Sequence, residues 1–223
     1  MSEMLNVLHP VVTKDYPENK QGGVMVCGIN FGYSEEDKSR DDSGSSLKVE
    51  PLSFFSDMAV NKTRFRDRLL TWLSSWGVDL ATSSGSEGGL ERSFFQTNWL
   101  NTQTNSVSSD GVISNDLLVK EAGGILDLMQ DRKPKLIILV GSCLIEVLND
   151  IRIRERVELI LGERSGNAII HRVDFPAMQG RKFKVFTQSF GNAKVIGLPH
   201  VQSRGLTNEY MARFDGVFKG VWV

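Results

Sequence analysis

The feature that most constrains the fold is the run Lys135-Leu136-Ile137-Ile138-Leu139-Val140, which Gly141-Ser142 turns directly into a second apolar segment, from about Cys143 to Asn149. A continuous apolar run of this length is typical of a strand that is buried on both faces. A strand that passes through a short glycine turn into a helix is the repeating unit of parallel α/β sheets. The sequence therefore predicts an α/β fold around a mainly parallel sheet.

The other apolar segments fit the same pattern. We expect strands at about residues 23–29, 94–100 and 194–198, and extended segments at 168–174 and 182–187. We expect helices at about residues 61–76, 116–130, 152–161 and 208–219. The first of these begins at a capping Asn61 and ends at Gly77, while Gly123-Gly124 weakens the second.

Length and composition favour a single domain. A chain of 223 residues can bury a substantial core, and we assign residues 1–223 to one domain with a polar loop at 34–53. No segment has the roughly 18 uninterrupted apolar residues of a membrane helix, so we expect no membrane partner. Cys27 and Cys143 lie in or beside apolar runs, which is typical of buried thiols in a reducing cytoplasm rather than of a disulfide or a metal site.

Polar loops follow two of the predicted strands. Near the N-terminus, the strand runs into Gly28-Ile29-Asn30-Phe31-Gly32, and near the C-terminus another strand ends at Leu198-Pro199-His200, followed by the polar loop 201–207. Ligands bind beyond the carboxyl ends of the strands in open α/β sheets. We therefore expect these two loops to share one pocket.

Charge is unevenly distributed along the chain. The net charge is −1, but residues 1–130 carry −7 and residues 131–223 carry +6. The basic half is suited to facing phosphates, with five cations before and within the histidine loop: Arg181, Lys182, Lys184, Lys194 and Arg204. An ordinary solvated surface explains the same distribution equally well, and the near-neutral total argues against nucleic-acid binding through total charge alone.

In their order along the chain, these segments resemble the motifs of the uracil-DNA glycosylase superfamily. Gly28-Ile29-Asn30-Phe31-Gly32 resembles the first motif, Gly-X-Asn-Pro-Gly in members that use asparagine, and His200 stands where the second motif, commonly His-Pro-Ser, supplies histidine. The single-strand-selective and related branches combine asparagine with histidine in this way. The chain departs from the family at Phe31, which replaces proline, and at Val201-Gln202-Ser203, which replaces Pro-Ser.

The resemblance implies a fold, a partner and a set of site residues. The fold is a three-layer α/β/α sandwich with a central, mainly parallel four-stranded sheet. The protein would act as a monomer, without cofactor or metal, on single-stranded or duplex DNA that contains a damaged base. The residues implied to contact the substrate are Gly28, Ile29, Phe31, Gly32, Phe54, Phe55 and Asn98, and those implied to contact DNA are Ser203, Arg204, Gly205 and Leu206.

The implied chemistry suits these residue types. Release of uracil needs stabilisation of an anionic leaving base and a cationic sugar, which requires no strong nucleophile. His200 would stabilise the departing base and Asn30 would orient a water, while Asn98 would pair with the uracil edge and Phe54 or Phe55 would stack on the base. Arg204 or Leu206 would fill the gap that a flipped nucleotide leaves.

Two other functions remain open from the sequence. The altered motifs and near-neutral charge also fit a non-catalytic member of the fold that binds nucleic acid or a protein partner. An enzyme acting on a free nucleotide would use the loop 28–32 as an anion cradle, but the chain has neither a P-loop nor a dinucleotide fingerprint. Taken singly, Asn30 is also explained as a turn residue and His200 as a surface residue at a strand end.

Overall fold

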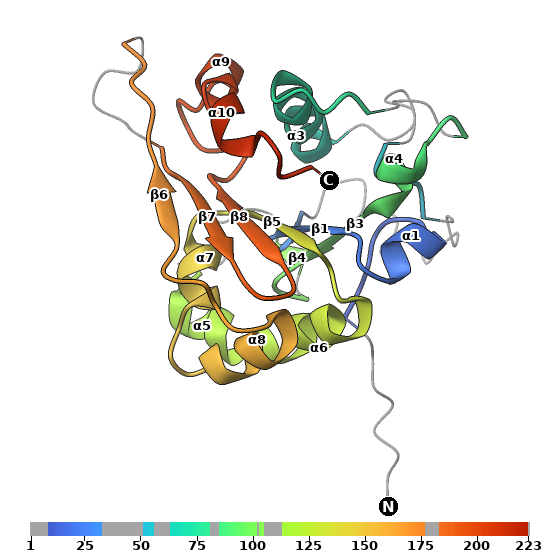
Figure 1. Cartoon of the computed structure of the whole chain (residues 1–223), viewed down its shortest axis with the longest axis vertical. Coiled ribbons are helices and arrows are strands. Elements are labelled where there is room, and N and C mark those ends of the chain that lie inside the picture. The colour runs from blue at the N-terminus through green and yellow to red at the C-terminus, as the bar shows by residue number, and fades with distance from the viewer. Residues whose placement is uncertain are drawn as a thin grey trace, which may run out of the picture.

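The computed structural model describes residues 9–32, 51–55, 63–80, 85–101, 103–104, 113–176 and 183–222. These residues form an α/β fold in which a six-stranded sheet carries helices on both faces (Figure 1). In sheet order, the strands are β3 (Phe94–Asn98), β1 (Val24–Gly28), β5 (Leu136–Val140), β8 (Lys194–Leu198), β7 (Val185–Ser189) and β6 (Ile169–His171). The first four are parallel, and β7 runs antiparallel to both β8 and β6.

The sheet is wider than the four strands that the family resemblance implies. The four parallel strands lie where the apolar runs predicted them, and the extended segments near residues 170 and 185 add two more. The turn between β7 and β8 closes with a hydrogen bond from the Phe190 amide to the Ala193 carbonyl, 2.8 Å long. This hairpin pairs the edge that β8 would otherwise expose, which explains the larger sheet.

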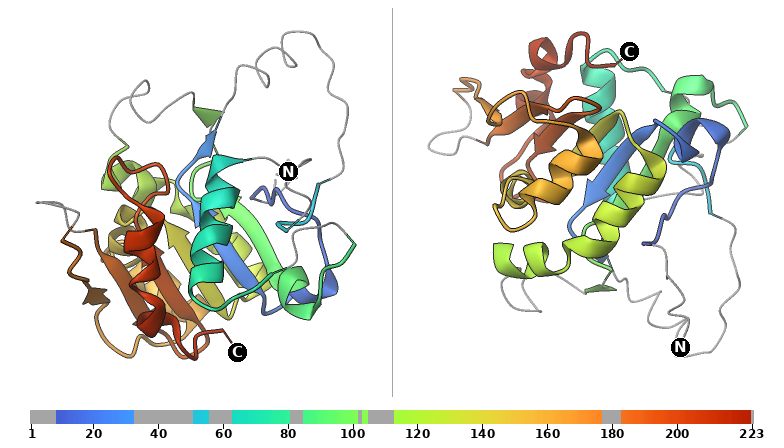
Figure 2. Two further views of the ribbon diagram at one scale, coloured as in Figure 1. Left: turned by 90° about the horizontal axis from the view of Figure 1, so that it is seen from above. Right: turned by 60° about the horizontal axis from the view of Figure 1, so that its bottom comes forward.

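Helices cover the two faces of the sheet in separate groups. One face carries α3 (Arg64–Ser75), α9 (Asn208–Ala212) and α10 (Asp215–Phe218), and the other carries α5 (Asn115–Lys120), α6 (Ala122–Arg132), α7 (Cys143–Leu148) and α8 (Arg154–Leu161) (Figure 2). Side chains alternate along β1 between the two cores, with Val24 and Val26 toward α3 and Met25 and Cys27 toward α6. The described part of the chain is thus a three-layer α/β/α arrangement.

Several helix boundaries differ from the sequence prediction. Thr63 caps α3 by accepting a hydrogen bond from the Arg66 amide, at 3.2 Å, whereas Asn61 lies outside the described residues. The single helix predicted at 116–130 is two helices, because Glu121 leaves the helical conformation between α5 and α6. The C-terminal helix is likewise divided into α9 and α10.

Four short elements were not predicted. Helices α1 (Pro17–Lys20) and α4 (Gly89–Ser93) pack against each other and against β3. Strands β2 (Phe31–Gly32) and β4 (Gln103–Thr104) pair in parallel, beyond the ends of β1 and β3. Their residues lie in segments that read as polar loops, and such short elements have too few residues to show a periodic pattern.

The N-terminal segment covers the outer edge of β3. The Val12 amide donates to the Gln96 carbonyl, and the Gln96 amide donates to Oγ1 of Thr13, both at 3.0 Å. Thr97 Oγ1 donates to the Pro10 carbonyl at 2.7 Å. These contacts satisfy backbone groups that an open sheet edge would expose.

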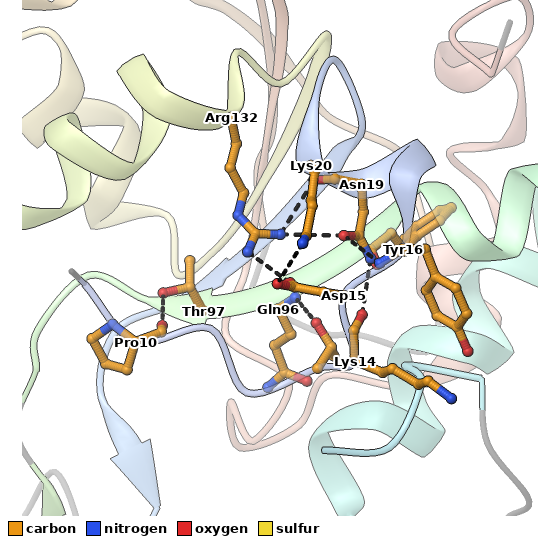
Figure 3. A network of polar contacts seen from close by, with 11 residues as sticks. Pro10, Lys14, Asp15, Tyr16, Asn19, Lys20, Gln96, Thr97 and Arg132 are labelled. Carbon is orange, nitrogen blue, oxygen red and sulfur yellow. Dashed lines mark hydrogen bonds and ion pairs between the residues drawn. The ribbon is translucent and has the colours of Figure 1, made fainter. Parts of the chain in front are cut away.

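A buried polar network fastens this segment to α6 (Figure 3). Asn19, which has no exposed surface, donates to the carbonyls of Lys14 and Phe94 at 3.0 and 3.1 Å. Its Oδ1 accepts from Nη1 of Arg132 at 3.2 Å, and Nη2 of Arg132 donates to Asp15 at 2.7 Å. Each buried group therefore has a partner, as a polar cluster inside a core requires.

Two further findings concern the described residues alone. None of their helices is long and apolar enough to cross a membrane, and no three of their His, Cys, Asp or Glu side chains gather in a set that could hold a metal ion. Cys27 and Cys143 are both free thiols, and burial raises the pKa of each.

Candidate functional site

The ends of three parallel strands meet at one edge of the sheet. Asn98 is the last residue of β3, and Asn30 and His200 each stand two residues beyond the ends of β1 and β8. Gly28 pairs directly with Asn98, and only β5 separates β1 from β8. Because neighbouring strands lie about 4.8 Å apart, the axes of β1 and β8 are roughly 10 Å apart.

Glycine at position 28 makes room for the Asn98 amide. A Cβ at Gly28 would lie 2.1 Å from Oδ1 of Asn98, well inside the contact distance of the two atoms. The same Cβ would lie 3.6 Å from Cε2 of Phe65, on the first turn of α3. The Asn98 amide therefore lies across the backbone of β1 beside the Phe65 ring, and its side chain is buried, with 5% of the residue exposed.

The loop that leads to Asn30 is held on both sides. The amides of Trp99 and Leu100 donate to the carbonyls of Gly28 and Ile29 at 2.8 and 2.9 Å, so the pairing of β1 with β3 continues past both strands. On the other side, Gly141 has a φ of +140°, and a Cβ there would lie 2.8 Å from the Ile29 side chain. A glycine after β5 thus lets Ile29 cross the end of that strand.

A hydrogen bond holds the neutral His200 ring in one tautomer. The Gln202 amide donates to Nδ1 of the ring at 3.3 Å. Because Nδ1 accepts this bond, the neutral ring carries its proton on Nε2. Burial lowers the pKa of His200, which favours the neutral imidazole at physiological pH. The ring is therefore a hydrogen-bond donor at Nε2.

The loop after His200 turns Leu206 inward. Leu206 is 6% exposed and belongs to the core beneath α3, together with the fully buried Val201. Arg204 and Gly205 are exposed, and Gly205 has a φ of +84°, while Ser203 is half-buried. Of the two residues proposed to enter a gap in DNA, the structure turns Arg204 outward and Leu206 into the core.

Phe54 and Phe55 do not join this edge. Both are buried in the core, and their ring centroids lie 6.1 and 4.9 Å from that of Phe94. Phe94 begins β3 and Asn98 ends it, a separation of about 13 Å at 3.3 Å per residue. Apolar packing against the start of β3 explains both rings.

The basic residues of the C-terminal half are dispersed. Lys184 precedes β7, whose register brings it beside the end of β8, whereas Lys194 begins β8 and lies at the opposite edge of the sheet. Arg181 and Lys182 lie outside the described residues, as do 34–50 of the polar loop and the side chain of Phe31. Three hollows, two beside α8 and one beside Arg132, are lined by none of the predicted site residues.

Three residues that lie beside the site are not part of any motif that the sequence analysis identified. Nε2 of His9 donates to the main-chain carbonyl of Asn98 at 2.5 Å, and the two residues are 89 positions apart in the chain. Phe65 lies on the first turn of α3, which brings its ring next to Asn98. Arg68 of α3 contacts the His200 loop.

Comparison with known proteins leaves the family open. A scan of the sequence against protein-family models matches none of them. A search of curated proteins likewise finds no match.

Proposed function

We propose that the protein is a DNA glycosylase that hydrolyses the N-glycosidic bond of uracil or a related damaged base. The observation that carries the proposal is the position of Asn30, Asn98 and His200 at the carboxyl ends of three parallel strands, with the Asn98 amide lying across Gly28. Open α/β sheets bind their ligands at this edge. The reaction itself is proposed from the resemblance of the motifs to those of the uracil-DNA glycosylase superfamily.

The chemistry of each side chain supports a role in base release. A water oriented by Asn30 attacks C1′ of the sugar, the bond from C1′ to N1 of the base breaks, and its electron pair leaves with the base as an anion. The base anion takes up the proton that the attacking water releases. Nε2 of His200 donates a hydrogen bond to the pyrimidine oxygen on which negative charge develops. Asn98 offers one acceptor and two donors, which match N3–H and O4 of uracil. The products are a free base and an abasic sugar.

The inward position of Leu206 supports a preference for single-stranded DNA. A duplex substrate requires the enzyme to fill the gap left by the flipped nucleotide, often with an apolar wedge. Leu206 is buried and hydrogen-bonded through its carbonyl to α3, so it is not available as an apolar wedge, and of the two residues expected to fill the gap only the polar Arg204 is exposed. An unpaired base needs no wedge, because the cost of unpairing is absent.

The test is release of uracil from labelled single-stranded and duplex oligonucleotides, followed by alkaline cleavage of abasic sites. Asn30→Ala and His200→Ala are each expected to lower the rate about 10²-fold or more, because an electrostatic donor in the transition state contributes that much. His171→Ala is the matched control, since His171 lies on β6 at the far edge of the sheet and bonds Oγ1 of Thr187 at 2.8 Å. It is expected to retain wild-type activity.

The second candidate is a non-catalytic member of the fold that binds single-stranded nucleic acid. The burial of Phe54, Phe55 and Leu206 favours it, because these positions were expected to grip a base or a duplex. Salt-sensitive binding of single-stranded DNA with an intact product would indicate this function. No strand scission on uracil, or on a panel of deaminated and oxidised bases, would overturn the glycosylase proposal.

A further inference from the structure

Helix α3 contacts the C-terminal segment through one row of side chains. Arg68, Trp72 and Trp76 follow one another at intervals of four residues, which places them on one face of the helix. Nε1 of Trp72 donates to Oδ1 of Asn208 at 2.9 Å, and Nε1 of Trp76 donates to the Met211 carbonyl at 2.8 Å. The two tryptophans therefore fasten α9 to α3, and Arg68 continues the row toward the His200 loop.

Arg68 contacts both ends of that loop. Its Nη1 donates to the carbonyl of Val201, the residue directly after His200, and its Nη2 donates to the carbonyl of Leu206 at 2.6 Å. The guanidinium group also lies over the Trp72 ring, 5.4 Å from the ring centroid. A guanidinium is planar and holds its donors in a fixed fork, so it sets the separation of the two carbonyls.

The loop between these two carbonyls is closed by its own hydrogen bonds. The Ser203 amide donates to the His200 carbonyl at 2.9 Å, and the Leu206 amide donates to the Ser203 carbonyl at 3.1 Å. The Gln202 amide, within the first of these turns, donates to Nδ1 of His200. The orientation of the His200 ring therefore depends on this turn. Arg68 holds the turn at Val201, the residue directly after His200.

We propose that Arg68 is a positioning residue that holds the 200–206 loop so that Nε2 of His200 faces the ligand at the sheet edge. This role rests on the proposed function of His200 in base release. Arg68 acts through the loop backbone and contacts no substrate. Removal of its two donors frees the Val201 and Leu206 carbonyls. The neutral His200 ring is then no longer held in the tautomer that carries its proton on Nε2.

The first test needs no substrate. The chain has three histidines, so the ring nitrogens of ¹⁵N-labelled protein can be assigned by substitution. At about pH 8, where imidazoles are neutral, the wild type is expected to show separate Nδ1 and Nε2 signals for His200. Arg68→Ala is expected to move these two signals toward each other, and Arg68→Lys, which offers one ammonium in place of the fork, is expected to give an intermediate shift.

Two controls separate positioning from general stability. Arg64→Ala removes an exposed cation one turn earlier on α3, and Trp76→Phe removes a donor that fastens α9. Both are expected to leave the His200 signals at their wild-type positions. Wild-type His200 signals in a folded Arg68→Ala or Arg68→Lys protein would overturn the proposal, as would an equal shift in Trp76→Phe.

The second test measures uracil release. Arg68→Ala is expected to lower kcat about 10²-fold with little change in KM, because a small displacement of a catalytic group costs that much. Arg68→Lys is expected to recover part of the loss. If the wild-type protein releases no base, the proposed function fails, while the His200 signals still decide whether Arg68 positions the ring.

Discussion

Replacement of Gly28 by alanine tests the geometry of the site directly. The new Cβ would lie 2.1 Å from Oδ1 of Asn98, so the oxygen has to retreat by more than about 1 Å to reach ordinary contact. A rotation of about 30° about the Asn98 Cα–Cβ bond achieves this at a cost of about 0.5–1.5 kcal/mol. Overpacking of a buried site of this kind costs about 1–3 kcal/mol in total. We expect Gly28→Ala to destabilise the fold by about 2 kcal/mol.

The assay is thermal and urea unfolding combined with uracil release. For a domain of this size, about 2 kcal/mol lowers Tm by roughly 4–8 °C. The control is the double variant Gly28→Ala with Asn98→Ala, in which the clash is absent. We expect a coupling energy of about 1–2 kcal/mol between the two positions, because residues in contact do not behave additively. Strictly additive effects, or Gly28→Ala with wild-type stability and activity, would refute the reasoning.

Three further changes test other parts of the structure. Urea unfolding should show Gly123→Ala to be stabilising by about 0.5–1 kcal/mol, since its Cβ would meet only Nη1 of Arg156, at 4.0 Å. Gly124→Ala should be destabilising, since its Cβ would lie 2.8 Å from Nδ1 of the buried His9. Burial lowers the pKa of His171 and His200, so the unfolded state binds protons more readily, and unfolding curves should show stability falling as the pH drops below about 6.5. Calorimetry of Asn19→Ala should show a loss of about 3 kcal/mol or more, because four hydrogen bonds of that side chain disappear inside the core.

Much of the fold follows from the sequence because buried parallel strands need continuous apolar runs. The four parallel strands lie where those runs predicted them, and the Gly141 turn leads into α7 as expected. The breaks at Glu121 and between α9 and α10 were missed because the apolar spacing continues through them. Local periodicity reports which face is buried, and it is insensitive to a one-residue departure from helical geometry.

The positions of the candidate residues in the fold were predicted in part. The loops after β1 and β8 and the end of β3 come to one edge of the sheet because these strands run parallel to one another. Phe54 and Phe55 were expected beside them but pack against Phe94 at the start of β3. An aromatic residue suits a core and a stacking platform equally, and only the path of the chain distinguishes the two.

By itself, the sequence determined which segments form the parallel sheet and that Asn30, Asn98 and His200 stand at strand ends, because strand pattern and direction are local properties. The tertiary structure alone decided the rest of the site. It laid the Asn98 amide across Gly28, turned Leu206 into the core, and brought Arg68 to the His200 loop from more than 130 residues away. Such contacts depend on how elements pack in space, and no local pattern in the chain encodes that packing.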